Sequence, residues 1–142
     1  MAPELTIGAH KARIAGDTLI VRWFGTPEMQ DLREIHDLFE RLLAEHGRVF
    51  LINHMHRSGL PTGEARKWLA NWFIGNRFAG IVNIGASTSI RVIQSLLMRG
   101  VALLHHKPKG LVTVAYCDTE AEALAWIAEC RRQHDRPASQ KE

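Results

Sequence analysis

The sequence predicts an α/β domain built on a mixed, largely parallel β-sheet, with strands and helices in the order ββαβαβαβα. Three observations support this prediction. Two runs of β-forming residues flank a short turn near the N-terminus, as in a β-hairpin. Apolar runs of strand length then alternate with amphipathic runs of helical length. The later strand runs are almost entirely apolar, which is typical of parallel strands that helices cover on both faces.

The composition is that of a globular protein. The chain has 142 residues, the length of one ordinary domain, with 46% hydrophobic and 23% charged residues. We expect a single domain over residues 1–135 and a flexible polar tail over 136–142. No apolar stretch reaches the ~18–20 residues of a transmembrane segment. No export signal is recognisable, and the two cysteines suit a reducing compartment, so we expect a cytoplasmic protein.

The predicted hairpin joins strands at 11–14 and 18–24, and a helix follows it. The residues Thr-Pro-Glu at 26–28 predict the start of that helix, with the threonine as cap and the proline at the first helical position. Apolar residues then recur at helical spacing until Gly47, where we expect the helix to end.

A second strand and helix pair follows the first. The strand is expected at 49–52, and residues 57–61 have the composition of a loop. Thr62 is a candidate cap for the next helix. Five residues of that helix share one apolar face, which we expect to be buried: Ala65, Trp68, Leu69, Trp72 and Phe73.

The remaining elements repeat the alternation. We expect a strand at 79–84, a helix that opens at 85–89, a strand at 111–116 and an amphipathic helix over 119–132. Right-handed crossovers would place these helices against the faces of one sheet.

The order of elements and the C-terminal segment resemble the SpoIIAA-like branch of the STAS superfamily. In many such proteins the last strand leads through an acidic cap into a pattern like E-A-L-A-W-L, which stands here as Glu-Ala-Leu-Ala-Trp-Ile at 122–127. The resemblance covers about residues 12–132 and implies a STAS-like fold. Members of the superfamily include antagonists of anti-sigma factors, scaffolds of stress complexes and cytosolic modules of anion transporters, and the fold does not choose among them.

The resemblance also implies a candidate regulatory position. In the anti-sigma-factor antagonists a regulatory serine lies in a D-S-S-G-like loop at the start of the helix after the third strand. Thr62 is the nearest equivalent in this chain, with Ser58 close by. Pro61 stands where those members have an aspartate, so phosphorylation by a partner kinase does not carry over with the resemblance.

The sequence contains no recognisable catalytic or metal-binding motif. His54 and His56 would share one face of a strand and could reach a common metal, but no third ligand is adjacent. Ser58 lies before a glycine without the pattern of a nucleophile elbow. We therefore predict no catalytic residue, no metal, no cofactor and no enzyme activity. A hydrolase or metalloenzyme built on these three residues is the least favoured alternative.

The helix that opens at 85–89 presents backbone N–H groups and the positive end of a helix dipole, which can hold an anion. We favour the simpler interpretation that Ser87 or Thr88 caps the helix. The candidate anion-binding residues are Arg57, Ser87, Thr88, Ser89 and Arg91.

The third helix carries more apolar residues than one buried face requires. The excess is either buried beneath the last helix or exposed as a surface for a partner or a second copy. The residues concerned are Val92, Leu96, Met98, Val101 and Leu104.

Together these features predict a regulatory signalling module that binds a protein partner or forms a homo-oligomer. The alternative is a domain that binds a small anionic ligand or a lipid head group at the start of the third helix. The net charge of +3 comes from scattered basic residues typical of a solvated surface, so we expect no nucleic-acid partner.

Overall fold

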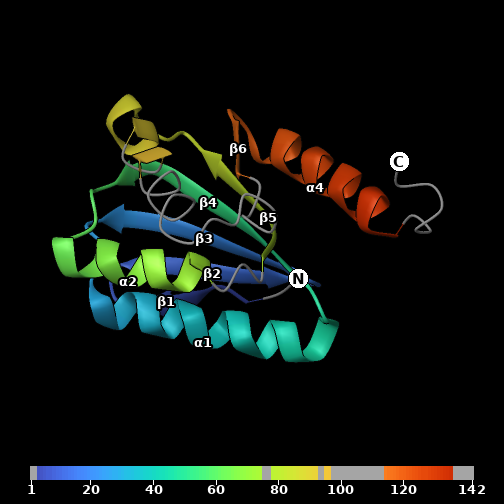
Figure 1. Cartoon of the computed structure of the whole chain (residues 1–142), viewed down its shortest axis with the longest axis horizontal. Coiled ribbons are helices and arrows are strands. Elements are labelled where there is room, and N and C mark those ends of the chain that lie inside the picture. Colours follow the sequence, from blue (N-terminus) through green and yellow to red (C-terminus); the bar gives the residue numbers. More distant parts are fainter. Residues whose placement is uncertain (1–2, 75–77, 93–94, 97–113, 136–142) are drawn as a thin grey trace.

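Six strands in sequential order, β1 to β6, form one mixed sheet in the computed structural model, which describes residues 3–74, 78–92, 95–96 and 114–135 (Figure 1). Residues 88–92 and 95–96 are helical as well. The bounds are β1 (Leu5–Ile7), β2 (His10–Ala15), β3 (Thr18–Gly25), α1 (Met29–His46), β4 (Val49–Ser58), α2 (Gly63–Ile74), β5 (Phe78–Ile84), β6 (Val114–Cys117) and α4 (Glu120–Asp135).

The sheet has the predicted mixed, largely parallel arrangement. β1, β2 and β3 pair antiparallel, and β3, β4, β5 and β6 pair parallel. The first strand was not predicted, because three residues are too few to show the alternation of a strand. It forms by pairing with β2, so its existence depends on its neighbour.

Two predicted boundaries are wrong. The first helix begins at Met29, and its N-cap is Glu28, not Thr26. The backbone N–H of Glu28 donates to the Asp31 carboxylate at 3.2 Å, so a side chain inside the helix caps its first turn. The end of the helix was predicted correctly, because Gly47 is the C-cap and its N–H donates to Leu43 O at 2.8 Å.

The second wrong boundary is the C-terminal end of β4. Arg57 and Ser58, which we expected in a loop, belong to the strand and pair with Phe24 and Gly25 of β3 after a register shift. The long β3 extends its neighbour beyond the apolar run, and the predicted loop at 57–61 begins only at Gly59.

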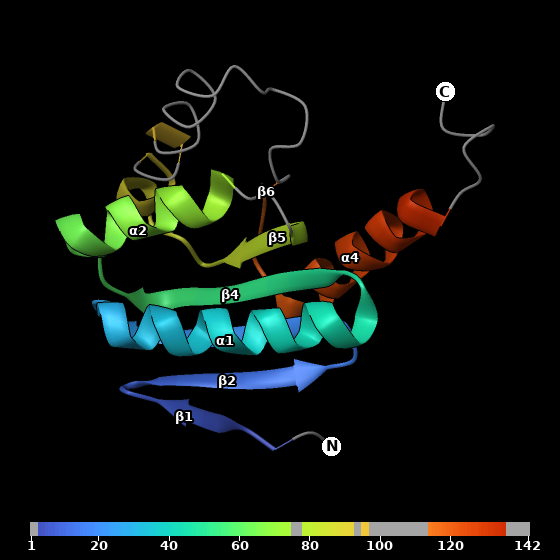
Figure 2. The same ribbon diagram turned by 60° about the horizontal axis from the view of Figure 1, so that its bottom comes forward.

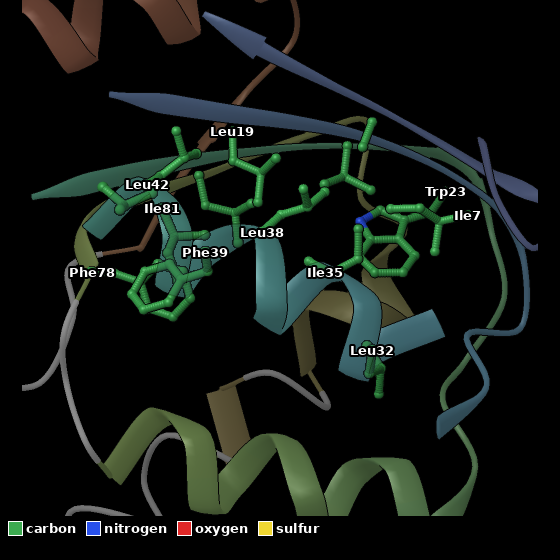
Figure 3. Close-up of a cluster of buried hydrophobic side chains, with 14 of the residues drawn as sticks. Ile7, Leu19, Trp23, Leu32, Ile35, Leu38, Phe39, Leu42, Phe78 and Ile81 are labelled. Atoms are coloured by element: carbon green, nitrogen blue, oxygen red, sulfur yellow. The ribbon is translucent and has the colours of Figure 1, made fainter. Parts of the chain in front are cut away.

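Helices cover both faces of the sheet, as the apolar strands predicted. Figures 1 and 2 show α1 and α2 on one side and α4 on the other. Leu51 and Ile81 point toward α1 and α2, whereas Phe50 and Ile52 point toward α4. The larger cluster, on the α1 side, is drawn in Figure 3 and includes Ile7, Leu19, Trp23, Leu32, Ile35, Leu38, Phe39, Leu42, Phe78 and Ile81.

The later helices agree with their predicted faces and starts. In α2, Ala65 is fully buried, and Trp68, Leu69 and Trp72 are half-buried against the larger core. The side chain of Phe73 lies outside the described residues. The last helix starts as predicted, because the Thr119 hydroxyl accepts a hydrogen bond from the backbone N–H of Glu122 at 3.2 Å.

Several predictions fall outside the described residues: those for Met98, Val101 and Leu104, for the first part of the strand at 111–116, and for the tail at 136–142. The division into a domain at 1–135 and a tail stays a prediction. Among the helices of the described chain, none is long and apolar enough to cross a membrane.

Candidate functional site

The carboxyl ends of β3, β4 and β5 lie at one end of the sheet, because these strands are parallel. The connection 59–62 leaves β4 there, and the helical residues 88–92 follow β5 at the same end (Figure 1). Open α/β sheets bind their ligands at such an edge. The segment after β4 and the segment after β5 therefore lie at the same end of the molecule.

Thr62 caps α2 as predicted. Its hydroxyl accepts a hydrogen bond from the backbone N–H of Ala65 at 3.1 Å, and the residue is exposed. The Ser58 hydroxyl donates to Gly59 O at 3.1 Å, and Arg57 is exposed at the end of β4. The capping role is therefore seen in the structure, and the regulatory role of Thr62 and Ser58 stays a prediction.

The residues of the predicted anion site also lie at this end. The Ser87 hydroxyl accepts a hydrogen bond from the backbone N–H of Ile90 at 3.2 Å, which makes Ser87 a helix cap. Thr88 and Ser89 are exposed, and the Arg91 guanidinium lies 4.7 Å from the centre of the Tyr116 ring. Binding of an anion by this group stays a prediction.

His54 and His56 do not converge on a common ligand. His54 Nε2 lies 2.8 Å from Glu120 Oε1, and an Arg13 guanidinium nitrogen lies 3.0 Å from the same oxygen. His56 is exposed and lies against Gly85. Within the described ranges no group of three or more His, Cys, Asp or Glu side chains could hold a metal ion.

Glu120 is held ionised by these contacts. Burial acts to raise the pKa of this carboxyl, but the hydrogen bonds and charges of His54 and Arg13 outweigh burial and lower the pKa. The cluster of Arg13, His54 and Glu120 ties the start of α4 to β2 and β4.

A feature that we did not predict is a cavity between the sheet and the two helices α1 and α2, at the same carboxyl end. We call it the carboxyl-end cavity. Its volume is about 110 Å³, and its walls are mostly apolar. Its walls include Trp23, Met55, Leu60, Arg66, Leu69 and Trp72, and its floor includes Asn53 and Asn83.

The floor is part of a row of hydrogen-bonded side chains that crosses four strands, which we call the amide ladder: Trp23, Asn53, Asn83 and Tyr116. The indole N–H of Trp23 donates to Asn53 Oδ1 at 2.9 Å, and Asn53 Nδ2 donates to Asn83 Oδ1 at 2.9 Å. The Asn83 side chain also hydrogen-bonds the Tyr116 hydroxyl. The two asparagines are only 8% and 1% exposed.

Burial is the main influence on Tyr116 and raises the pKa of its phenol, although Asn83 and Arg91 act to lower it. The hydroxyl is therefore protonated at neutral pH. The sequence holds a signal that could have found the ladder, since Asn53 and Asn83 each follow an apolar strand run. A polar amide at such a position needs a buried partner.

A buried histidine and aspartate pair lies nearby but is not a catalytic pair. His10 Nε2 lies 3.1 Å from Asp31 Oδ2, and the backbone N–H of Phe24 donates to His10 Nδ1 at 3.0 Å. Because Nδ1 accepts this bond, Nε2 carries the proton and donates to Asp31. Both ring nitrogens are thus occupied, and the pair fastens β2 to the start of α1.

No family model and no curated protein matches this chain by sequence. Solved structures do match. The unphosphorylated form of the anti-sigma factor antagonist SpoIIAA matches with a TM-score of 0.59 and 12% identity, over 84% of this chain and 98% of that one. This chain has the SpoIIAA-like fold. An uncharacterized protein of the DUF3478 family from Shewanella loihica PV-4, itself SpoIIAA-like in fold, matches with a TM-score of 0.54 and 17% identity, over 83% of this chain and 91% of that one.

The SpoIIAA-like fold confirms the resemblance that the C-terminal segment suggested. The small Ala123 is fully buried in α4, so the helix approaches the sheet closely, and Ile127 fills the space one turn later. These are packing contacts, and they indicate a fold but no chemistry.

Proposed function

We propose that this chain is a non-enzymatic regulatory module that binds a protein partner through the carboxyl end of its sheet. The SpoIIAA structure that shares the fold is that of an anti-sigma factor antagonist in its unphosphorylated form. The proposal extends a role in regulation by protein contact to this chain. Its location is argued from this chain's own surface.

The observation that carries the proposal is the exposure of apolar side chains on the two segments that follow β4 and β5. Leu60, Val92 and Leu96 are 44%, 52% and 61% exposed. They are three of the five large apolar residues that are exposed in the described part of the chain. Exposed apolar groups that gather at one place mark interaction surfaces. We call this surface the docking edge; it comprises Arg57, Leu60, Thr62, Arg66, Arg91, Val92 and Leu96.

Charge on the docking edge indicates what kind of partner it fits. Arg57, Arg66 and Arg91 are all exposed beside the apolar residues. A complementary surface would present apolar side chains flanked by Asp or Glu, because opposite charges guide association and favour the correct orientation. The proposed occupant is therefore an acidic and apolar patch of another protein.

Thr62 is the proposed point of control. Its hydroxyl is exposed at the start of α2, within the docking edge. A negative charge at this position would repel an acidic partner and would also interact with Arg66. Thr62→Asp is a suitable mimic of a phosphorylated Thr62, because aspartate remains a good helix cap and adds a negative charge.

The test compares two exposed leucines. A partner captured by the tagged wild-type chain from its native lysate is purified, and its affinity for each variant is measured by calorimetry. Leu96→Glu and Thr62→Asp should each weaken binding by at least about tenfold. Leu124→Glu is the matched control, because Leu124 is 43% exposed on α4 and lies outside the docking edge. Its affinity should stay within about twofold of wild type.

Two results would count against this proposal. Wild-type affinity in Leu96→Glu and Thr62→Asp variants with native circular dichroism would show that the docking edge is misplaced. Light scattering that shows a defined homo-oligomer, dissociated by Leu96→Glu and not by Leu124→Glu, would assign the surface to a second copy of the chain.

A further inference from the structure

We propose that the carboxyl-end cavity is a binding site for a small amphipathic carboxylate, whose hydrocarbon body fills the cavity and whose acid group pairs with Arg66 at the mouth. The cavity shares Leu60 and Arg66 with the docking edge, whereas its interior residues do not belong to that edge. The inference does not depend on the existence of a protein partner.

The size and lining of the cavity indicate an apolar occupant. Protein interiors are close-packed, and voids much larger than a water molecule are few. The volume here is about 110 Å³, and Met55, Leu69 and Trp72 supply hydrocarbon or aromatic surface. The apolar part of this lining favours a hydrocarbon group over water, because water makes no hydrogen bonds with it.

Arg66, at the mouth of the cavity, is the one charged residue in its described lining. Arg66 lies near the start of α2, is exposed, and makes no ion pair with any described residue. A guanidinium pairs with a carboxylate through two parallel hydrogen bonds, which are stronger than bonds between neutral groups. The pairing with Arg66 would therefore be the main interaction that orients a ligand with a carboxylate head.

The floor of the cavity fixes which end of the ligand enters. Asn53 and Asn83 are uncharged, and their hydrogen bonds along the amide ladder hold both amides in place. A buried carboxylate beside neutral amides would lose its hydration without gaining an opposite charge. The apolar end must therefore point inward and the acid outward. An amide can make four hydrogen bonds and Asn53 makes two with described residues, so a hydroxyl on the inward chain would also be accepted.

The test uses octanoate and its neutral analogue 1-octanol as probes of the full chain. Binding is followed by calorimetry and by tryptophan fluorescence, since Trp23 and Trp72 line the cavity. Octanoate should bind saturably and more tightly than 1-octanol. Met55→Trp, which fills the cavity from β4, should weaken both probes by at least about tenfold while the thermal midpoint is kept or raised.

Arg66 is tested against its neighbour on the same helix. Arg66→Gln should weaken octanoate by about tenfold and leave 1-octanol within about twofold. Lys67→Gln is the matched control, because Lys67 is also exposed on α2 and is not among the described residues that line the cavity. It should bind both probes as the wild type does.

Three results would overturn the proposal. The first is no saturable binding of octanoate, decanoate or dodecanoate to the wild type. The second is unchanged octanoate binding in a folded Met55→Trp variant, or in Leu69→Phe, which fills the cavity from the helix side should Met55→Trp not fold. The third is an equal effect of Arg66→Gln and Lys67→Gln. Loss of the protein partner in Leu96→Glu leaves all three measurements unaffected, so the two proposals fail separately.

Discussion

Asp17 is the residue on which the amino end of the sheet depends. Its carboxylate accepts hydrogen bonds from Arg48 Nε at 3.0 Å, from the guanidinium of Arg131 and from the Thr18 hydroxyl. Burial acts to raise the pKa of Asp17, but its bonds to Arg131 and Arg48 outweigh burial and lower the pKa. The Asp17 carboxylate therefore holds together three parts of the fold: the hairpin turn, the start of β4 and the end of α4.

Asp17→Asn should destabilise the protein by about 1–3 kcal/mol at pH 7, because it removes the charge from these hydrogen bonds. The folded-state pKa lies below the unfolded value of about 4, so the stabilisation is present above that value and is lost as the pH falls through the folded-state pKa. Urea unfolding at pH 7 and near pH 3 should show the difference between variant and wild type shrinking in acid. A difference that is independent of pH would contradict this account.

The control for this prediction is Asp37→Asn. Asp37 is exposed on α1 and has no ion pair among the described residues. Its substitution should change the free energy of unfolding by less than about 0.5 kcal/mol at either pH.

At the scale of the element, the two ends of α1 are held in different ways. Its start depends on Asp31, which also accepts a hydrogen bond from His10 of β2. Its end depends on the backbone alone, because Gly47 has a φ of 77° and donates to Leu43 O. A side chain at that φ is strained even where space is free, so the glycine is needed for its backbone and not for room.

Gly47→Ala should therefore cost about 1 kcal/mol of stability. Gly63→Ala is the matched variant, since Gly63 is the first residue of α2, has open space at its Cβ position and has no positive φ. Alanine there should be neutral or stabilise by up to about 1 kcal/mol. Thermal unfolding of the two variants should shift in opposite directions or only for Gly47→Ala; equal losses would refute the distinction.

At the scale of the whole molecule, the described residues cover the two faces of the sheet unequally. Among them, the cluster beneath α1 and α2 contains fifteen buried apolar residues, whereas the cluster beneath α4 contains seven. Among the described helices, α4 alone covers the second face, where it contacts β5 and β6 (Figure 2). Its attachment depends on Ala123 and Ile127 and on the ion pairs of Asp17 and Arg48.

Backbone amides of α4 should therefore exchange with solvent through a smaller opening free energy than those of α1. Hydrogen exchange followed by mass spectrometry measures this directly. Ile127→Ala should cost about 2–5 kcal/mol and speed exchange in α4, because Ile127 is fully buried. The exposed Leu124, one turn earlier on the same helix, is the control, and Leu124→Ala should leave exchange unchanged. Equal protection of α1 and α4 would show that the layers open together.

The predicted site was recovered only in part, and particular residues show why. Thr62 and Ser87 were among the capping candidates, because a cap acts on backbone groups two or three residues away. From the sequence, Val92 and Leu96 could be either buried beneath the last helix or exposed. Only the structure shows that these two side chains are exposed. The carboxyl-end cavity joins Trp23, Met55 and Leu69 from three separate elements, and no local pattern connects them.

The sequence by itself determined the alternation of strands and helices, the end of α1 at Gly47 and the SpoIIAA-like order of elements. These features depend on periodicity and capping, which involve residues close together in the sequence. The tertiary structure decided the rest. Pairing with β3 extended β4 to Ser58, the carboxylate of Asp31 moved the start of α1, and three adjacent parallel strands aligned Asn53 and Asn83 with Tyr116. Each of these depends on contacts between residues far apart in the chain, whose energy appears only once the sheet has formed.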